Sequence, residues 1–264
     1  MMGRMRAADF VYFDAPFLAF AHRGGARYAP NLHRENSRHS FEEAAALGYR
    51  YFETDVHATA DGVLLAFHDD RLDRVTDRSG LIAELPHEEV ARARIHGLDP
   101  IPTLAELLTA FPTTRFNIDA KSPSAVRLLA GTIAEHEAHD RVCVSSFGVR
   151  RLRELRRRLG PRTASCVSAA GVAVNRFLPW LTWALNSPAP ALQIPVTQVL
   201  RGRRVTLVTP ALLATAHRAG KQVHVWTVDD AAEMERLLDL GVDGLFTDRV
   251  DTLKEVLTGR GLWA

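Results

Sequence analysis

The chain has 264 residues, of which 47% are hydrophobic and 24% are charged. This composition is typical of a soluble globular protein and excludes a disordered or fibrous one, and at this length an α/β barrel of about 250 residues is the commonest single-domain fold. The 33 basic and 31 acidic residues leave a formal net charge of +2, which is too small to indicate nucleic acid as a partner.

The first twenty residues lack the features of a secretory signal, because Asp9 and Asp14 interrupt the apolar region that such a signal requires. Cys143 and Cys166 each lie in a short apolar run that is typical of a core strand, where a free thiol packs like a small apolar residue. We therefore predict a cytoplasmic protein without a structural disulfide.

Short apolar runs rich in β-branched and aromatic residues alternate along the chain with helical patterns that end at Gly or Pro. This alternation is typical of a parallel sheet. The predicted strands lie at 18–22, 51–56, 115–118, 142–146, 163–167, 192–196, 223–227 and 244–247. Eight such strands predict one α/β domain, a (β/α)₈ TIM barrel over 17–258, with an N-terminal extension at 1–16 and a C-terminal tail at 259–264.

One connection departs from simple alternation. The helices around it are plain: one ends at Gly48, and Thr103 begins the next. Between the second and third strands, however, an Asp61-Gly62 turn separates two strand-like runs, and the long segment 69–100 follows. Because the active site of a barrel lies at the carboxyl ends of its strands, we expect this extended loop insertion to form a wall of the site.

The first strand ends in a group of residues suited to phosphate chemistry. Arg23 can bind phosphate oxygens in a planar geometry, His22 can transfer a proton near neutral pH, and Gly24 and Gly25 let the backbone approach a ligand. A His-Arg pair is as often structural as functional, but His68 in the insertion supplies a second imidazole at the same mouth. Two histidines suit a cleavage in which one group takes a proton and the other gives one.

The second strand places Glu53, Asp55 and His57 on one side, because side chains alternate along a strand. Two neighbouring carboxylates repel each other unless a cation compensates them, and oxygen ligands favour Mg²⁺ or Ca²⁺. An ordinary ion-pair network is the structural alternative. His57, which lies beyond the expected strand end, fits a supporting loop residue as well as a site residue.

The third strand adds a carboxylate and a cation. Asn117, Asp119 and Lys121 share a face by the same alternation. Asp119 would complete a metal site with Glu53 and Asp55, and Lys121 would neutralise a phosphate. Taken alone, this segment also fits an unremarkable strand end.

Three features in the later part of the chain each allow two interpretations. The apolar stretch 172–185 contains Asn175 and Arg176 and is shorter than the roughly 20 residues that span a bilayer. It fits a buried helix, or a cap that contacts lipid or substrate tails. Trp226 fits the core or a pocket wall, and Asp248 fits a helix start or the site.

Taken in order, these segments resemble the glycerophosphodiester phosphodiesterase family from residue 21 to residue 251. The matching motifs are His22-Arg23-Gly24-Gly25, Glu35-Asn36-Ser37, Glu53-Thr54-Asp55-Val56, Phe67-His68-Asp69-Asp70, Ile101-Pro102-Thr103-Leu104, Asn117-Ile118-Asp119-Ala120-Lys121, Ser145-Ser146-Phe147, Val225-Trp226-Thr227-Val228 and Gly241-Val242-Asp243-Gly244 through Thr247-Asp248. The resemblance implies a TIM barrel, a divalent cation (Mg²⁺ or Ca²⁺), and hydrolysis of a small-molecule glycerophosphodiester to sn-glycerol 3-phosphate and an alcohol.

The resemblance also implies a role for individual residues. The implied roles are His22 and His68 as the acid–base pair, Glu53, Asp55 and Asp119 as metal ligands, Arg23 and Lys121 as phosphate-binding residues, Glu35 as a residue near the metal or glycerol, and Trp226 as a wall of the pocket. Two departures leave details open. Asp119 replaces the family's usual Glu, and residues 31–34 separate Pro30 from Glu35 in the first loop, which bears on metal choice and substrate preference.

Three rival functions are weighed against this one. A lysophospholipase D-type phosphodiesterase on the same scaffold would expose Phe177, Leu178, Trp180 and Trp183 at the mouth. An amidohydrolase-type barrel would have a His-x-His pair on the first strand, but position 24 is Gly. A catalytically silent binding barrel would normally lack one of the two histidines or a carboxylate. The sequence does not choose between water and the glycerol 2-hydroxyl as nucleophile, and it does not indicate the oligomeric state.

Overall fold

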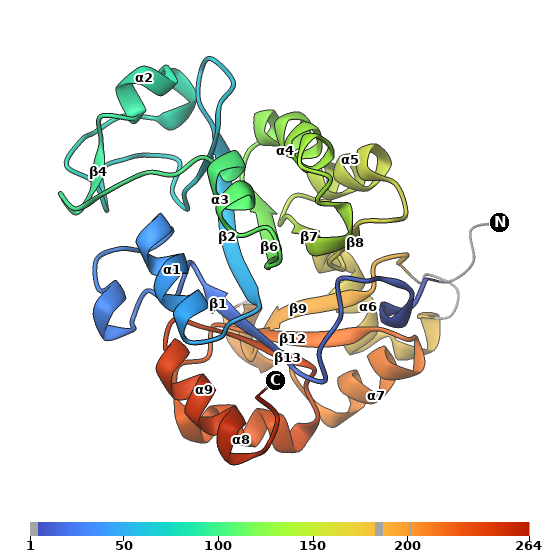
Figure 1. Ribbon diagram of the computed structural model, residues 1–264. Coiled ribbons are helices and arrows are strands. Elements are labelled where there is room, and N and C mark those ends of the chain that lie inside the picture. Colours follow the sequence, from blue (N-terminus) through green and yellow to red (C-terminus); the bar gives the residue numbers. More distant parts are fainter. Residues whose placement is uncertain (1–4, 183–186, 201, 264) are drawn as a thin grey trace.

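The computed structural model describes residues 5–182, 187–200 and 202–263. Within these ranges, eight parallel strands form a barrel with helices around it (Figure 1). The barrel strands are β1 (Leu18–His22), β2 (Tyr51–Ala58), β6 (Arg115–Ala120), β7 (Val142–Ser145), β8 (Ala164–Ser165), β9 (Ala191–Pro195), β12 (Gln222–Trp226) and β13 (Gly244–Thr247). Each predicted strand is present, and the predicted TIM barrel is confirmed.

Pairing around the barrel is uneven. The strand order is β8-β7-β6-β2-β1-β13-β12-β9. The β2–β6 pair is long and regular, running from Tyr51 opposite Arg115 to Val56 opposite Ala120. The β8–β9 side closes instead through a single bridge between Cys166 and Ala191. We call this junction the seam of the barrel.

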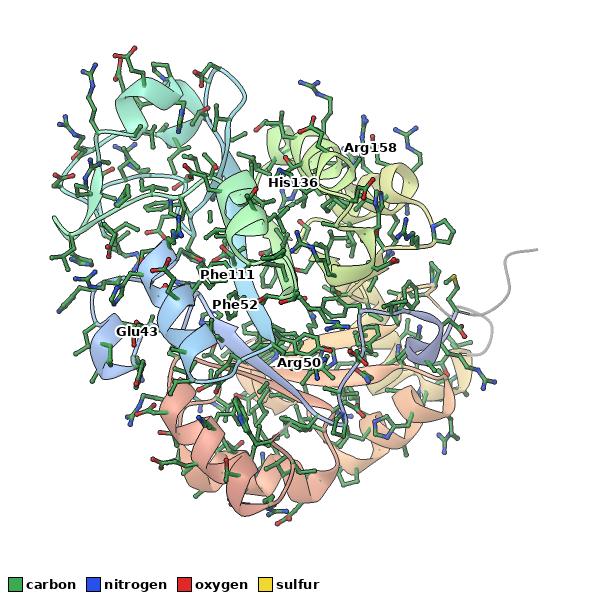
Figure 2. All side chains as sticks on the ribbon, in the orientation of Figure 1. Glu43, Arg50, Phe52, Phe111, His136 and Arg158 are labelled. Carbon is green, nitrogen blue, oxygen red and sulfur yellow. The ribbon has the colours of Figure 1, made fainter. Side chains whose placement is uncertain are left out.

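The helices of the barrel pack their apolar faces against the strands. They are α1 (Arg38–Ala46), α3 (Leu104–Ala110), α4 (Pro123–Glu135), α5 (Val149–Leu159), α6 (Ala169–Phe177), α7 (Pro210–Arg218), α8 (Ala231–Leu240) and α9 (Val250–Gly259). Ser37 and Thr103 cap the first turns of α1 and α3, and the position of Thr103 was predicted from the sequence. Figure 2 shows Phe52 and Phe111 inside the molecule, where their rings are 5.2 Å apart, and Arg158 on the outer surface of α5.

The insertion after β2 is a separate small unit with its own core. The turn at Asp61 and Gly62 joins β2 to the antiparallel β3 (Leu64–Ala66), as predicted. The unit continues through η3 (Ile82–Glu84), α2 (His87–Val90), β4 (Arg94–Ile95) and β5 (Asp99–Pro100), to one side of the barrel (Figure 1). Its buried side chains form a cluster of their own: Leu65, Phe67, Leu72, Val75, Ile82, Val90, Ala93, Ile95 and Ile101.

The N-terminal segment covers the end of the barrel opposite the expected site. It contains the short helix η1 (Ala7–Asp9), and Phe10 and Tyr12 are buried against Phe20 and Tyr51. The remaining short elements are η2 (Ala29–Asn31), η4 (His139–Arg141), η5 (Pro179–Leu181), β10 (Thr197–Leu200) and β11 (Arg203–Thr206).

Two further expectations concern the chain as a whole. Cys143 and Cys166 are both free and buried, as predicted. Among the helices in the described ranges, none has the length and apolar character needed to cross a bilayer.

Candidate active site

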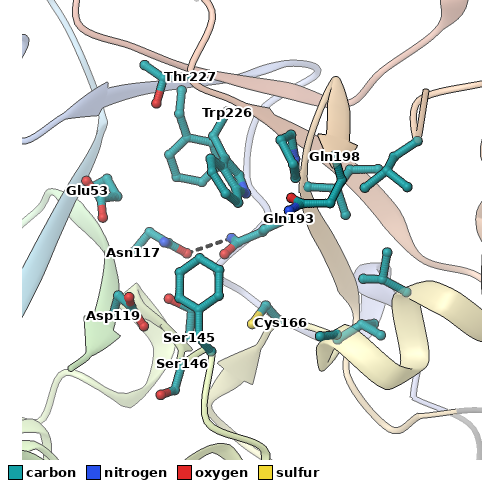
Figure 3. A pocket seen from close by; sticks show the side chains of 18 of the residues that line it. Glu53, Asn117, Asp119, Ser145, Ser146, Cys166, Gln193, Gln198, Trp226 and Thr227 are labelled. Atoms are coloured by element: carbon teal, nitrogen blue, oxygen red, sulfur yellow. Dashed lines mark hydrogen bonds between the residues drawn. The ribbon is translucent and has the colours of Figure 1, made fainter. Parts of the chain in front are cut away.

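A cavity of about 550 Å³ opens where the barrel strands end (Figure 3). Eight of the nine predicted site residues line it: His22, Arg23, Glu53, Asp55, His68, Asp119, Lys121 and Trp226. Glu35 is not among the lining residues and lies behind Arg23, with Oε1 3.4 Å from Nη1 of the guanidinium. The sequence therefore predicted which side chains lie together, because the strand ends that carry most of them meet at one edge of the sheet.

Three buried carboxylates form the acidic part of the cavity. The side chains of Glu53, Asp55 and Asp119 are no more than 8% exposed. The pairing of β2 with β6 places Asp55 directly opposite Asp119. Burial, followed by the neighbouring charge of Asp55, raises the pKa of Glu53 to about 7. This part of the cavity therefore concentrates negative charge where little solvent reaches it.

Two cationic side chains balance part of this charge. Nζ of Lys121 is 2.8 Å from both Asp55 Oδ1 and Asp119 Oδ2, and Arg23 Nε is 3.3 Å from Asp55 Oδ2. Burial alone would raise the pKa of Asp55, but Lys121 and Arg23 outweigh it and lower that pKa. Burial would also lower the pKa of Lys121, but the two aspartates raise it. Lys121 is therefore held as a cation at the cavity wall.

The donor chemistry of the carboxylates fits a hard cation. Asp55 Oδ2 and Asp119 Oδ1 are buried without a hydrogen-bond partner in the described part of the chain. Carboxylate oxygens that accept no hydrogen bond are ligands that Mg²⁺ and Ca²⁺ favour, and Asp55 Oδ2 also lies 3.3 Å from Nε of Arg23. In the same part of the chain, however, no three His, Cys, Asp or Glu side chains converge closely enough to form a ready metal cluster. The two aspartates are joined by Lys121, whose Nζ atom contacts both of them.

Each histidine of the cavity has a carboxylate on its Nδ1 atom. Asp248 Oδ1 lies 2.7 Å from Nδ1 of His22, and Asp69 Oδ1 lies 2.6 Å from Nδ1 of His68. A carboxylate accepts a hydrogen bond from Nδ1–H, which leaves Nε2 as the atom that exchanges a proton with a ligand. His22 Nε2 is 3.7 Å from Glu53 Oε2. Asp248, for which the sequence left two roles open, thus enters the site.

Burial and neighbouring charges act on both histidine–carboxylate pairs. Burial alone would lower the pKa of His22, but Glu53 and Asp248 outweigh it and raise that pKa. Partial burial would raise the pKa of Asp69, but hydrogen bonds from Arg74 and His68 lower it to about 2. Asp69 therefore stays ionised and keeps its imidazole in one orientation.

Arg74 of the insertion links the two walls of the site. Its guanidinium donates to Glu35 Oε1 at 2.6 Å and to Asp69 Oδ1 at 3.1 Å. Glu35 in turn contacts Arg23, so a continuous chain of charges runs from the insertion to the first strand. Nothing in the spacing of Arg74 from these residues in the sequence indicated this link, because it depends on how the insertion lies over the barrel.

Three residues that the sequence singled out lie outside the cavity lining. A Cβ atom at Gly24 would lie 2.2 Å from Ser40 Oγ, and one at Gly25 would lie 2.6 Å from Val250. These glycines therefore permit close packing against α1 and α9, and neither lines the cavity. His57 is also outside the cavity lining, and its Nε2 lies 3.1 Å from the backbone oxygen of His68.

The cavity extends away from the carboxylates toward the seam, and this end is mostly apolar. Asn117 and Gln193 meet between the two ends, where Gln193 donates to Asn117 Oδ1 at 2.6 Å (Figure 3). Beyond them the walls come from α6, β9 and the segment around the β10–β11 hairpin. We call this end the apolar arm, and it is lined by Val167, Val172, Ala173, Phe177, Ile194, Pro195, Leu200 and Leu207.

Comparisons with known proteins agree over nearly the whole chain. Residues 22–252 match the model of the "Glycerophosphoryl diester phosphodiesterase family". The chain is 41% identical over 256 residues to "Probable glycerophosphodiester phosphodiesterase 2" of Mycobacterium tuberculosis, with 93% of this chain and 92% of the relative covered. It is 26% identical over 275 residues to a lysophospholipase D of Rattus norvegicus, with 90% and 85% covered.

A solved structure supports the same fold. A phosphodiesterase of Oleispira antarctica, determined in complex with sn-glycerol-3-phosphate, has a TM-score of 0.76 and 24% identity, with 91% of this chain and 96% of that chain covered. The protein described here is thus an enzyme of the phosphoric diester hydrolase class. It belongs to the glycerophosphoryl diester phosphodiesterase family.

Proposed function

We propose that the protein hydrolyses glycerophosphodiesters to sn-glycerol 3-phosphate and an alcohol, using a divalent cation and two histidines. The observation that carries the proposal is the meeting of Glu53, Asp55 and Asp119 with His22 and His68 around one cavity. The product named for the Oleispira antarctica structure is the one that this reaction would release.

The cation would be held by the three carboxylates. Asp55 Oδ2 and Asp119 Oδ1, which have no hydrogen-bond partner in the described ranges, support this assignment, as does the raised pKa of Glu53. When bound, a divalent cation supplies positive charge that polarises the phosphoryl oxygens and stabilises the transition state. Either Mg²⁺ or Ca²⁺ satisfies the oxygen-rich donor set.

The remaining residues of the chain orient the phosphate and move protons. Arg23 and Lys121 donate to its non-bridging oxygens and keep the reacting phosphorus between the two imidazoles. Nε2 of one histidine takes the proton from the nucleophile, which is water or the glycerol 2-hydroxyl; the second route forms a cyclic phosphate that a water molecule then opens to give sn-glycerol 3-phosphate. Nε2 of the other histidine gives a proton to the departing alcohol oxygen. Trp226 closes the pocket against water on the side of β12.

The direct test is turnover of glycerophosphocholine by the wild type and by His22→Ala and His68→Ala variants. We expect each variant to lose about 10² to 10⁴-fold in kcat while the fold is retained. His139→Ala, in η4 and outside the cavity, is the matched control and should turn over normally. Chelation should abolish turnover, and Mg²⁺ or Ca²⁺ should restore it. Near-normal rates in either cavity variant at saturating metal would remove the proposed role.

A lysophospholipid is the second candidate substrate, and the apolar arm favours it. Phe177 and Leu178 are 42% and 38% exposed and Trp180 is 63% exposed, as this function would require. Trp183 lies outside the described residues. The lysophospholipase D of Rattus norvegicus adds support from a relative. A lysophosphatidylcholine assay separates the two substrates, because a preference for the soluble diester would show that the arm does not bind an acyl chain.

The cellular location and the domain limits at 17 and 258 stay as predicted from the sequence. Cytoplasmic location is compatible with either substrate, and fractionation of cells that produce the protein tests it.

A further inference from the structure

Two exposed apolar segments stand at the open end of the apolar arm. The first runs from the end of α6 into η5 and exposes Trp180 at 63%. The second is the β10–β11 hairpin, which exposes Val199 at 60%. We call the exposed apolar side chains of both segments the apolar rim, which consists of Phe177, Leu178, Trp180, Val199 and Leu200. Apolar groups this exposed and this close together mark an interaction surface.

The two segments belong to one surface. Arg176 of α6 donates from Nε to the backbone oxygen of Thr206 on β11, at 3.1 Å. Phe177 from the first segment and Leu200 from the second line the same cavity. The rim is therefore continuous with the inside of the apolar arm, and a partner seated on the rim would also cover the arm's opening.

The chain segment that carries the rim has charged residues of one sign. No Asp or Glu occurs anywhere between Glu154 and Asp229, although the whole chain has 31 acidic residues. Within that stretch, Arg203 and Arg204 are exposed on β11, beside the rim. The guanidinium of Arg176 lies 5.0 Å from the centre of the Phe177 ring, so that cation and apolar ring occupy one place. A partner for this surface must have a negatively charged outer layer with apolar groups beneath that layer.

We propose that the apolar rim docks on a bilayer that contains anionic phospholipids. Trp180 and Val199 enter the boundary between headgroups and acyl chains, while Arg203 and Arg204 contact the phosphates. In this position the apolar arm opens directly into the lipid layer, and an amphiphilic phosphodiester can pass from the membrane into the cavity without crossing water. The docking surface extends the cap considered for residues 172–185 to the hairpin, which the sequence did not indicate.

Vesicle co-sedimentation of the full chain tests the proposal without any substrate, so the result does not depend on the proposed reaction. The probes are vesicles of phosphatidylcholine alone and of phosphatidylcholine mixed with an equal amount of phosphatidylglycerol. We expect binding to the mixed vesicles, weaker binding to the neutral ones, and loss of binding at high salt.

Two pairs of substitutions locate the surface. Trp180→Ser combined with Val199→Ser should weaken binding to the mixed vesicles about tenfold or more, because the apolar contact is lost. Arg203→Gln combined with Arg204→Gln should weaken it by a similar factor and remove the preference for anionic lipid. Val11→Ser is the matched control, since Val11 is 63% exposed at the opposite end of the barrel, and it should bind as the wild type does.

Several outcomes would overturn the proposal. The first is absence of binding to the mixed vesicles, and the second is equal loss of binding in the rim variants and in Val11→Ser. A third is a dimer in solution that Trp180→Ser combined with Val199→Ser dissociates, in the absence of vesicle binding, which would assign the rim to a second copy of the chain. Normal turnover of glycerophosphocholine by the rim variants would show that they are folded.

Discussion

His224 should make the protein less stable as the pH falls below neutrality. Its side chain is fully buried in the barrel, with its ring 5.2 Å from that of Phe20, and burial lowers its pKa to about 3. An unfolded chain binds the proton below an ordinary pKa of about 6.5, but the folded chain does not. Acid therefore stabilises the unfolded state, and this effect grows from about pH 6.5 down to about pH 3.

The magnitude follows from the same two pKa values. Each pH unit below about 6.5 costs about 1.4 kcal/mol, so lowering the pH from about 7.5 to about 5 removes about 2 kcal/mol of unfolding free energy through this residue alone. The assay is urea denaturation at both pH values for the wild type, His224→Leu and His224→Gln. Subtracting the variants cancels other titrating groups, and the wild type should lose about 2 kcal/mol more than either variant.

Equal pH dependence in the wild type and in both variants would refute the reasoning. It would mean that the His224 imidazole is protonated as readily in the folded barrel as in the unfolded chain. Two variants are used since leucine removes the hydrogen bond with Gln222, whereas glutamine keeps a polar group there. The argument requires that both variants show the same reduced pH dependence, even if they differ in stability at neutral pH.

Three further predictions concern the site itself. Asp248→Asn should lower kcat on glycerophosphocholine by about 10²-fold or more without unfolding the chain, because the orientation and tautomer of His22 are lost; an unchanged kcat would show that this contact is not needed. Gly24→Ala should lower the unfolding free energy by about 2 kcal/mol in urea denaturation, because the new Cβ meets Ser40 and φ is +83°; a change below about 0.5 kcal/mol would contradict that packing. Lys121→Met should cost about 3 kcal/mol in the absence of metal, and added Mg²⁺ or Ca²⁺ should raise its Tm more than that of the wild type, whereas equal metal responses would argue against a cation among these carboxylates.

The strand-borne half of the site was predictable from the sequence. Alternation along β2 and β6 fixed which side chains face inward, and parallel pairing of adjacent strands then set Asp55 beside Asp119. These are local rules with a period of two residues. The insertion was predictable in position, from its turn at Asp61 and Gly62, and so was its contribution of His68 to the cavity.

The contacts that depend on the closed barrel were not predictable. His22 and Asp248 meet because Ala21 lies opposite Thr247 in the β1–β13 pair, although 226 residues separate the two side chains in the sequence. The packing of Gly24 was not predictable for a similar reason, since its neighbour Ser40 lies on a helix whose tilt no local pattern specifies. The sequence did not predict the hairpin formed by β10 and β11, because strands that are mostly exposed lack the regular apolar pattern that a buried face produces.

The seam between β8 and β9 gives the two ends of the cavity different mechanical character. The carboxylates and His22 stand on β1, β2 and β6, whose backbones are paired without interruption, over three residues between β1 and β2 and over six between β2 and β6. The apolar arm borders the bridge at Cys166, where few backbone bonds would have to lengthen for the walls to separate. Under the proposed function, the alcohol part of the substrate would lie beside this weakly joined seam, and the reacting atoms would lie among the regularly paired strands.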